Sequence, residues 1–133
     1  MALLIGALLA LAVGLFATGL GLDRDRAFYP VVTIVIASYY ALFAVMGAST
    51  HALVLESLVG AFFLAVAISG FRWSLWVVVV ALAAHGILDL THDTFIANAG
   101  VPVWWPEFCL TYDLMAAAYL AWSLKSGRIR ATA

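Results

Sequence analysis

The sequence predicts an all-α membrane protein, a polytopic bundle of five transmembrane helices with its N-terminus outside and its C-terminus inside. Of the 133 residues, 67% are hydrophobic and 10% are charged, whereas soluble domains have about 45–50% and about 25%. The mean hydropathy is +1.14. Because a small soluble domain leaves much of its surface in water, it could not hide so many apolar side chains. We therefore expect a single transmembrane domain over residues 1–133.

Apolar segments set the expected helices, since a helix needs roughly 20 mostly apolar residues to cross the hydrocarbon core. We expect spanning helices over about 2–22, 28–48, 51–71, 73–90 and 106–125. The last segment is the least apolar of these, because Glu107 and Asp113 lie in it. Pro106 nevertheless suits the first position of a helix, where its missing N–H costs no hydrogen bond.

The basic residues predict the orientation. With five spans, the first loop, the third loop and the C-terminus share one side of the membrane. All the basic residues fall on that side: Arg24, Arg26, Arg72, Lys125, Arg128 and Arg130. Because cytoplasmic loops are enriched in Lys and Arg, this side is predicted to be cytoplasmic, in a bacterial inner membrane. The sequence has no basic cluster suited to binding nucleic acid, so nucleic acid is not an expected partner.

The outer half carries the candidate site. His85, Asp89 and His92 follow at spacings of four and three, which puts their side chains on one helical stripe about 60° wide. Each ionisable group in a spanning helix disfavours insertion by about 2–3 kcal/mol at mid-membrane, and such groups usually face the bundle interior. The stripe therefore indicates function. The other interpretation is a neutral His85–Asp89 pair, with His92 and Asp93 among the lipid headgroups.

Neighbouring helices add further acids at a comparable depth. We expect Asp89, Asp113 and Glu56 to include the catalytic base. About 140° of helix separates His51 from Glu56, so His51 can share their site only if it belongs to the turn. Cys109 lies four residues before Asp113, on the same face, and is expected to be a small apolar filler.

The residue types predict a metal centre. The predicted ligands of a divalent transition metal, zinc or iron first, are His85, Asp89, His92 and His51. The function that follows is a metal-dependent membrane enzyme, a hydrolase or a proton-transfer enzyme, acting on a lipidic or amphipathic substrate at the outer face. The alternatives are a metal-free proton network and a non-enzymatic transporter, ion-binding or haem-binding subunit of a larger membrane complex.

Membrane lipids are the expected partners, and the protein is small enough to expect a homo-oligomer or a larger complex. A stripe of small residues in the first segment allows another helix to approach closely, within the bundle or in self-association. That stripe consists of Gly6, Ala10, Gly14 and Thr18.

A family resemblance rests on two runs. The first is His85-Gly-x-x-Asp89-x-x-His92, and the second is Gly100-Val-Pro-x-Trp-Trp-Pro-x-Phe-Cys109-x-x-Tyr-Asp113. Together they resemble a pattern of small, uncharacterised bacterial integral-membrane proteins, over roughly the last third of the chain. The resemblance implies no activity. Three histidines with a serine and acids are also similar to the metal-dependent lipid amidases of the alkaline ceramidase type, which have more spans and different spacings.

Overall fold

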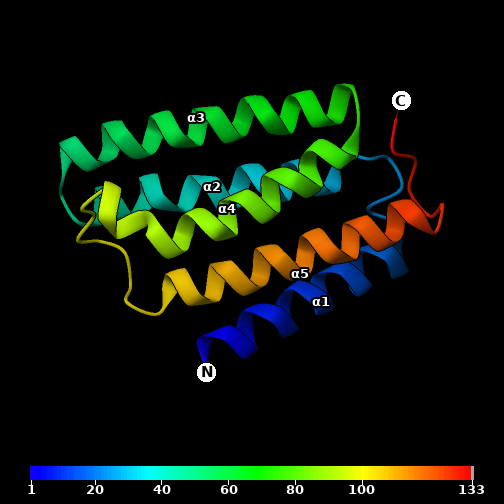
Figure 1. The fold of residues 1–133 in the computed structure, drawn as a ribbon, viewed down its shortest axis with the longest axis horizontal. Helices are drawn as coiled ribbons and strands as arrows, with labels where there is room; N and C mark the ends of the chain where they lie inside the picture. The colour runs from blue at the N-terminus through cyan, green and yellow to red at the C-terminus, as the bar shows by residue number, and fades with distance from the viewer. Residues whose placement is uncertain (133) are drawn as a thin grey trace.

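The structure, a computed structural model, describes residues 1–132 and is all-helical over that range (Figure 1). Its helices are α1 (Ala2–Leu20), α2 (Phe28–Met46), α3 (Thr50–Arg72), α4 (Leu75–Phe95) and α5 (Trp105–Lys125). Each expected segment is helical, with one substantial difference in length. The fourth helix continues to Phe95 instead of ending near residue 90, so the whole His85-to-Asp93 stripe is helical.

Four helices, α1 to α4, are long and apolar enough to cross a membrane, which fits an integral membrane protein. The fifth helix is of similar length, with 21 residues, but it contains Glu107, Asp113 and Lys125. Its crossing of the membrane, and the side on which each terminus lies, stay predictions.

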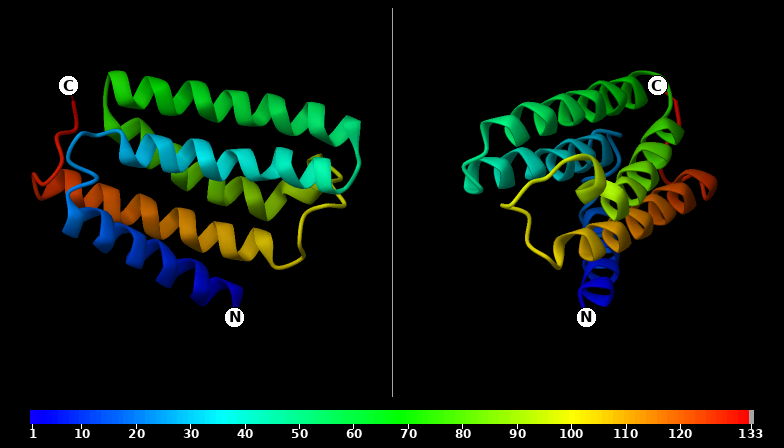
Figure 2. Two further views of the ribbon diagram at one scale, coloured as in Figure 1. Left: turned by 180° about the vertical axis from the view of Figure 1, so that it is seen from behind. Right: turned by 60° about the vertical axis from the view of Figure 1, so that its left-hand side comes forward.

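The position of α5 explains how a less apolar helix can belong to this bundle. It packs against α1 on one side and α4 on the other, while α2 pairs mainly with α3 (Figure 2). Its polar side chains Asp113 and Ser123 are consequently buried between neighbouring helices. A carboxyl group so enclosed avoids the cost of facing lipid.

Small residues allow these close approaches. A side chain at Gly6 of α1 would collide with the carbonyl oxygen of Phe108 on α5. At Gly14 an added Cβ would lie 2.9 Å from the Tyr119 ring, also on α5. The stripe of small residues therefore packs within the bundle, against the last helix of the same chain.

The segment between α4 and α5, residues 96–104, folds back onto the end of α2. A Cβ at Gly100 would overlap the carbonyl oxygen of Phe43, so only glycine fits this contact. Next to the segment, the Trp105 ring packs against the rings of Tyr39 and Phe43, with centroids 5.1 and 4.9 Å apart. We call the end of the bundle that carries residues 96–104 the loop end.

We expect single cysteines in place of Ala2 and Thr132 to react from opposite sides of the membrane in sealed vesicles, Ala2→Cys from outside and Thr132→Cys only after permeabilisation. The reason is the placement of all basic residues on one side by five spans. Labelling with a membrane-impermeant maleimide measures this. The wild type is the background control, because its one cysteine, Cys109, is buried. Both positions reacting from the same side would contradict the five-span topology.

Gly86→Ala should destabilise the protein by about 1–3 kcal/mol, because overpacking forces the backbone to shift. The new Cβ would lie 3.0 Å from Asp113 Cβ and 3.1 Å from the Leu110 carbonyl oxygen. Gly60→Ala is the matched control, since its Cβ would meet only Ala37 O at an ordinary 3.6 Å. Unfolding in detergent micelles, followed by circular dichroism, compares the two. Equal stabilities would contradict the tight α4–α5 contact.

Candidate metal centre

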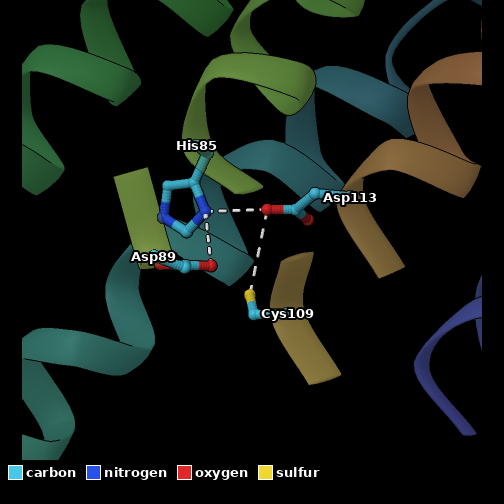
Figure 3. Close-up of side chains that lie close together, drawn as sticks. All are labelled: His85, Asp89, Cys109 and Asp113. Atoms are coloured by element: carbon cyan, nitrogen blue, oxygen red, sulfur yellow. Dashed lines mark hydrogen bonds and ion pairs between the residues drawn. The ribbon is translucent and has the colours of Figure 1, made fainter. Parts of the chain in front are cut away.

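Two helices supply four buried side chains with metal-binding atoms. On α4, His85 and Asp89 lie one turn apart, and on α5 the same spacing separates Cys109 and Asp113. These side chains point toward a common centre (Figure 3), and one ligand atom from each lies within 4.8 Å of all the others. None of the four residues is more than 2% exposed.

The shortest distances join the two helices. His85 Nδ1 is 2.8 Å from Asp113 Oδ2 and 3.6 Å from Asp89 Oδ2. The Cys109 thiol donates to the same Asp113 oxygen at 3.8 Å. His85, Asp89 and Asp113, which the sequence puts at comparable depth on neighbouring helices, thus lie close together. Donor atoms around a tetrahedral zinc ion are about 3.5 Å apart, so small side-chain movements would close this set on an ion.

The depth of the cluster follows from its position along the helices. His85 lies ten residues before the end of α4, and Asp113 lies eight residues after the start of α5. At 1.5 Å per residue these positions are about 15 Å and about 12 Å from the helix ends. Because α4 and α5 run in opposite directions, the two residues meet at one level, well inside the apolar part of the bundle.

Three carboxylate oxygens of the cluster have no hydrogen-bond partner among residues 1–132, namely both oxygens of Asp89 and Oδ1 of Asp113. A buried polar atom without a partner costs about 1–3 kcal/mol, and more if it is charged. Two carboxyl groups so close also repel each other when both are ionised. A divalent cation would relieve both costs, so the residues present fit a metal ion.

A second cluster, formed by Glu56, His92 and Asn98, lies nearer the loop end. His92 Nε2 is 2.8 Å from Glu56 Oε1. The Asn98 side chain donates to the same oxygen at 2.9 Å and to the carbonyl oxygen of Tyr40 at 3.1 Å. His92 Nδ1 faces Asp93 Oδ1 at 3.4 Å. We call Glu56, His92 and Asn98 the Glu56 cluster.

The structure therefore divides the expected site residues. It brings His85, Asp89 and Asp113 together, and it pairs His92 with Glu56 instead of adding either to that group. His51 is exposed in the first turn of α3 and belongs to neither cluster in the part of the chain described.

Three residues gain a place at the site that the sequence did not give them. Cys109, expected as a filler, offers its sulfur to the first cluster, and its spacing of four from Asp113 was the available indication. Asn98, in the segment between α4 and α5, is buried against Glu56. The Tyr40 ring stacks on His92 with centroids 4.1 Å apart, and no spacing pattern on α2 marks it.

An apolar groove reaches the first cluster from the side. It has a volume of about 380 Å³ and lies between α1, α2 and α5. Aliphatic and aromatic side chains line it, including Val35, Tyr39 and Phe108. Cys109 also lines it, so this one residue belongs to both the groove and the cluster.

Comparisons of the chain with protein-family models, with curated proteins and with solved structures give no match. The resemblance to small bacterial membrane proteins stays a prediction.

Asn98→Ala should lower the free energy of unfolding by about 1–3 kcal/mol, because the buried Glu56 carboxylate loses a donor. Chemical unfolding in detergent micelles measures the change. Thr94→Ala is the control, since its hydroxyl makes only an exposed bond to the Thr91 carbonyl oxygen. If both variants lose the same stability, the buried contact of Asn98 adds nothing to the fold.

Proposed function

We propose that this integral membrane protein binds a divalent transition metal between α4 and α5, and that it is a metal-dependent enzyme. The ligands would be His85, Asp89, Cys109 and Asp113. The observation that carries the proposal is the convergence of four buried donor atoms, all within 4.8 Å of one another. Zinc is the best match, because it accepts nitrogen, sulfur and oxygen donors in a four-coordinate site. Iron is the second choice.

The donor set itself argues against the hard cations. Calcium and magnesium prefer oxygen ligands, whereas here one donor is an imidazole nitrogen and another is a cysteine sulfur. Burial also favours a bound ion, since Asp89 and Asp113 are 2% and 0% exposed. Two ionised carboxylates would balance a divalent charge in these surroundings.

The apolar groove supports a lipidic or amphipathic substrate. A hydrocarbon chain would fit among its aliphatic and aromatic walls, and Cys109 would then lie between that chain and the ion. Bound there, the metal would supply a Lewis acid for a carbonyl or phosphoryl group. Asp113 would orient His85, and Asp89 would accept a proton when it is not bound to the ion, which also leaves a ligand position for the substrate. Such an enzyme would be a hydrolase or a proton-transfer enzyme.

The predicted topology would put this site in the outer half of a bacterial inner membrane, in contact with membrane lipids. Homo-oligomerisation or membership of a larger complex is part of the same proposal. The second candidate is a metal-free proton-transfer site, and the 2.8 Å contact between His85 and Asp113 favours it. The dense packing of His85 argues against a haem ligand, because its ring already lies 4.8 Å from Phe63 and faces two carboxylates.

Elemental analysis of the purified protein tests the metal. The wild type should carry about one zinc or iron per chain, and a chelator should lower its melting temperature, because a ligand that binds only the folded state stabilises it. His85→Ala and Asp113→Ala should each abolish the bound metal, whereas Cys109→Ser should retain it with weaker affinity. Each of the two alanine variants loses a buried donor of the set.

His51→Ala is the matched control, since that histidine is exposed and outside the cluster. It should keep both the metal and the chelator effect. A wild type that stays metal-free after incubation with zinc, iron, manganese or copper, and that ignores the chelator, would leave only the proton-transfer candidate.

A further inference from the structure

Outside the metal centre, the imidazole of His92 lies between two carboxylates, one of them buried and the other exposed to solvent. Its Nε2 is 2.8 Å from Glu56 Oε1, and its Nδ1 is 3.4 Å from Asp93 Oδ1. The Glu56 side chain is 1% exposed and the Asp93 side chain is 80% exposed. One ring therefore joins the surface at the loop end to the buried interior.

The geometry around His92 is held from several directions. Asn98 donates to the same Glu56 oxygen that faces His92, which fixes the carboxylate in place. The Tyr40 ring stacks on the imidazole at 4.1 Å and so fixes the plane of the imidazole. The ionisable groups that surround the ring are Glu56 from α3, Tyr40 from α2, and His85, Asp89 and Asp93 from α4.

Tyr40 also connects this ring to the metal centre. Its ring centroid lies 6.2 Å from that of His85, and its hydroxyl lies beside the Asp89 carboxylate. That hydroxyl is buried and makes no hydrogen bond of good geometry within the described chain. The same is true of both Asp89 oxygens, so polar atoms line the short interval between the two clusters.

We propose that Asp93, His92 and Glu56 form a proton relay between the aqueous boundary at the loop end and the buried His85–Asp113 centre. In the inward direction, Asp93 or water gives a proton to His92 Nδ1, and the N–H bond at Nε2 breaks as its proton passes to Glu56. The ring then carries its proton on Nδ1, and a half-turn flip of the imidazole within its own plane restores the first tautomer.

From Glu56 the path continues over the Tyr40 hydroxyl, which has no other partner in the described chain. Glu56 gives its proton to the hydroxyl oxygen as the hydroxyl's own proton passes to the Asp89 carboxylate beside His85. Each group that receives a proton gives one up, and no electron moves.

The relay would supply the proposed enzyme with protons, so its biological role rests on the proposed function, whereas the proton path itself does not. Metal ligands bind deprotonated, and acid–base chemistry on a substrate exchanges protons with water. A centre this far from the surface needs a path for those protons. Near the loop end, the buried polar side chains besides His92 are few, chiefly Glu56 and Asn98. The lateral groove, by contrast, is lined almost entirely by apolar side chains.

The competing explanation of the same contacts is mechanical. The Glu56 cluster would then act only as a latch that holds residues 96–104 onto α2 and α3. The two explanations predict opposite effects on hydrogen exchange at the buried centre. Loss of a latch opens the loop end and speeds exchange, whereas loss of a relay slows it.

The single cysteine of the chain gives a native reporter of this exchange. The Cys109 thiol donates to Asp113 inside the buried centre, and no other cysteine contributes to the infrared S–H stretching band. The protein, reconstituted in vesicles and stripped of metal with a chelator, is transferred to D₂O, and the conversion of S–H to S–D is followed with time. The metal-free state lets the relay be tested whether or not the metal proposal holds.

The variant His92→Gln keeps a donor for Glu56 but cannot accept a proton on one side and release it on the other. It should slow the S–H exchange at least about tenfold, in keeping with the contribution of a positioned acid–base group. Glu56→Gln should have the same effect and decides the matter if His92→Gln does not fold. Asp93→Asn should have a smaller effect, because water reaches that exposed position.

His51→Gln is the matched control, an exposed histidine near the same end of the bundle, and it should exchange at the wild-type rate. Exchange in folded His92→Gln and Glu56→Gln at the wild-type rate would overturn the relay in favour of another route for water. Faster exchange would overturn it in favour of the latch. If the two variants exchange slowly but the wild type binds no metal, the relay is supported and the metal centre is rejected.

Discussion

The contact between His85 and Asp113 ties together the two helices on which the rest of the structure depends. Both side chains are buried well inside a bundle that is otherwise apolar. A carboxyl group on α5 is costly in lipid, so α5 must be flanked by helices on both sides, and α1 and α4 supply those flanks. The glycines along these contacts follow from the same need, because they let backbones approach closely enough to exclude lipid.

The two polar clusters differ in what surrounds them, and this difference gives them different chemistry. The His85 cluster has a sulfur atom, unpartnered carboxylate oxygens and full burial, which suit an ion. The Glu56 cluster satisfies its carboxylate with two donors and reaches an exposed residue, which suits a mobile proton. Tyr40 contacts both, so a change in one cluster has a short path to the other.

Much of this arrangement could be predicted from local sequence, and the remainder depends on tertiary contacts. Hydropathy predicted the helical segments, and the helical repeat predicted that His85 and Asp89 share a face. Because Asp113 lies at a similar depth in its own helix, the sequence also indicated that it is near them. The contact of His92 with Glu56 could not be predicted in this way, because it depends on how α3 packs against α4. It also depends on how residues 96–104 fold back and place Asn98 beside Glu56. The role of Cys109 depends on His85 and Asp89, which α4 places opposite it. The exposure of His51 depends on where α3 begins.

The pairing of α1 with α5 has a consequence for biosynthesis. α1 leaves the ribosome before its main partner, α5, so α1 enters the membrane while the three intervening helices are still to be made. During that interval its row of small residues faces lipid or another protein. The least apolar helix, α5, then arrives at a surface already present in the bilayer, where α1 and α4 enclose its polar side chains. The contact between α1 and α5 therefore forms only after α5 has been made.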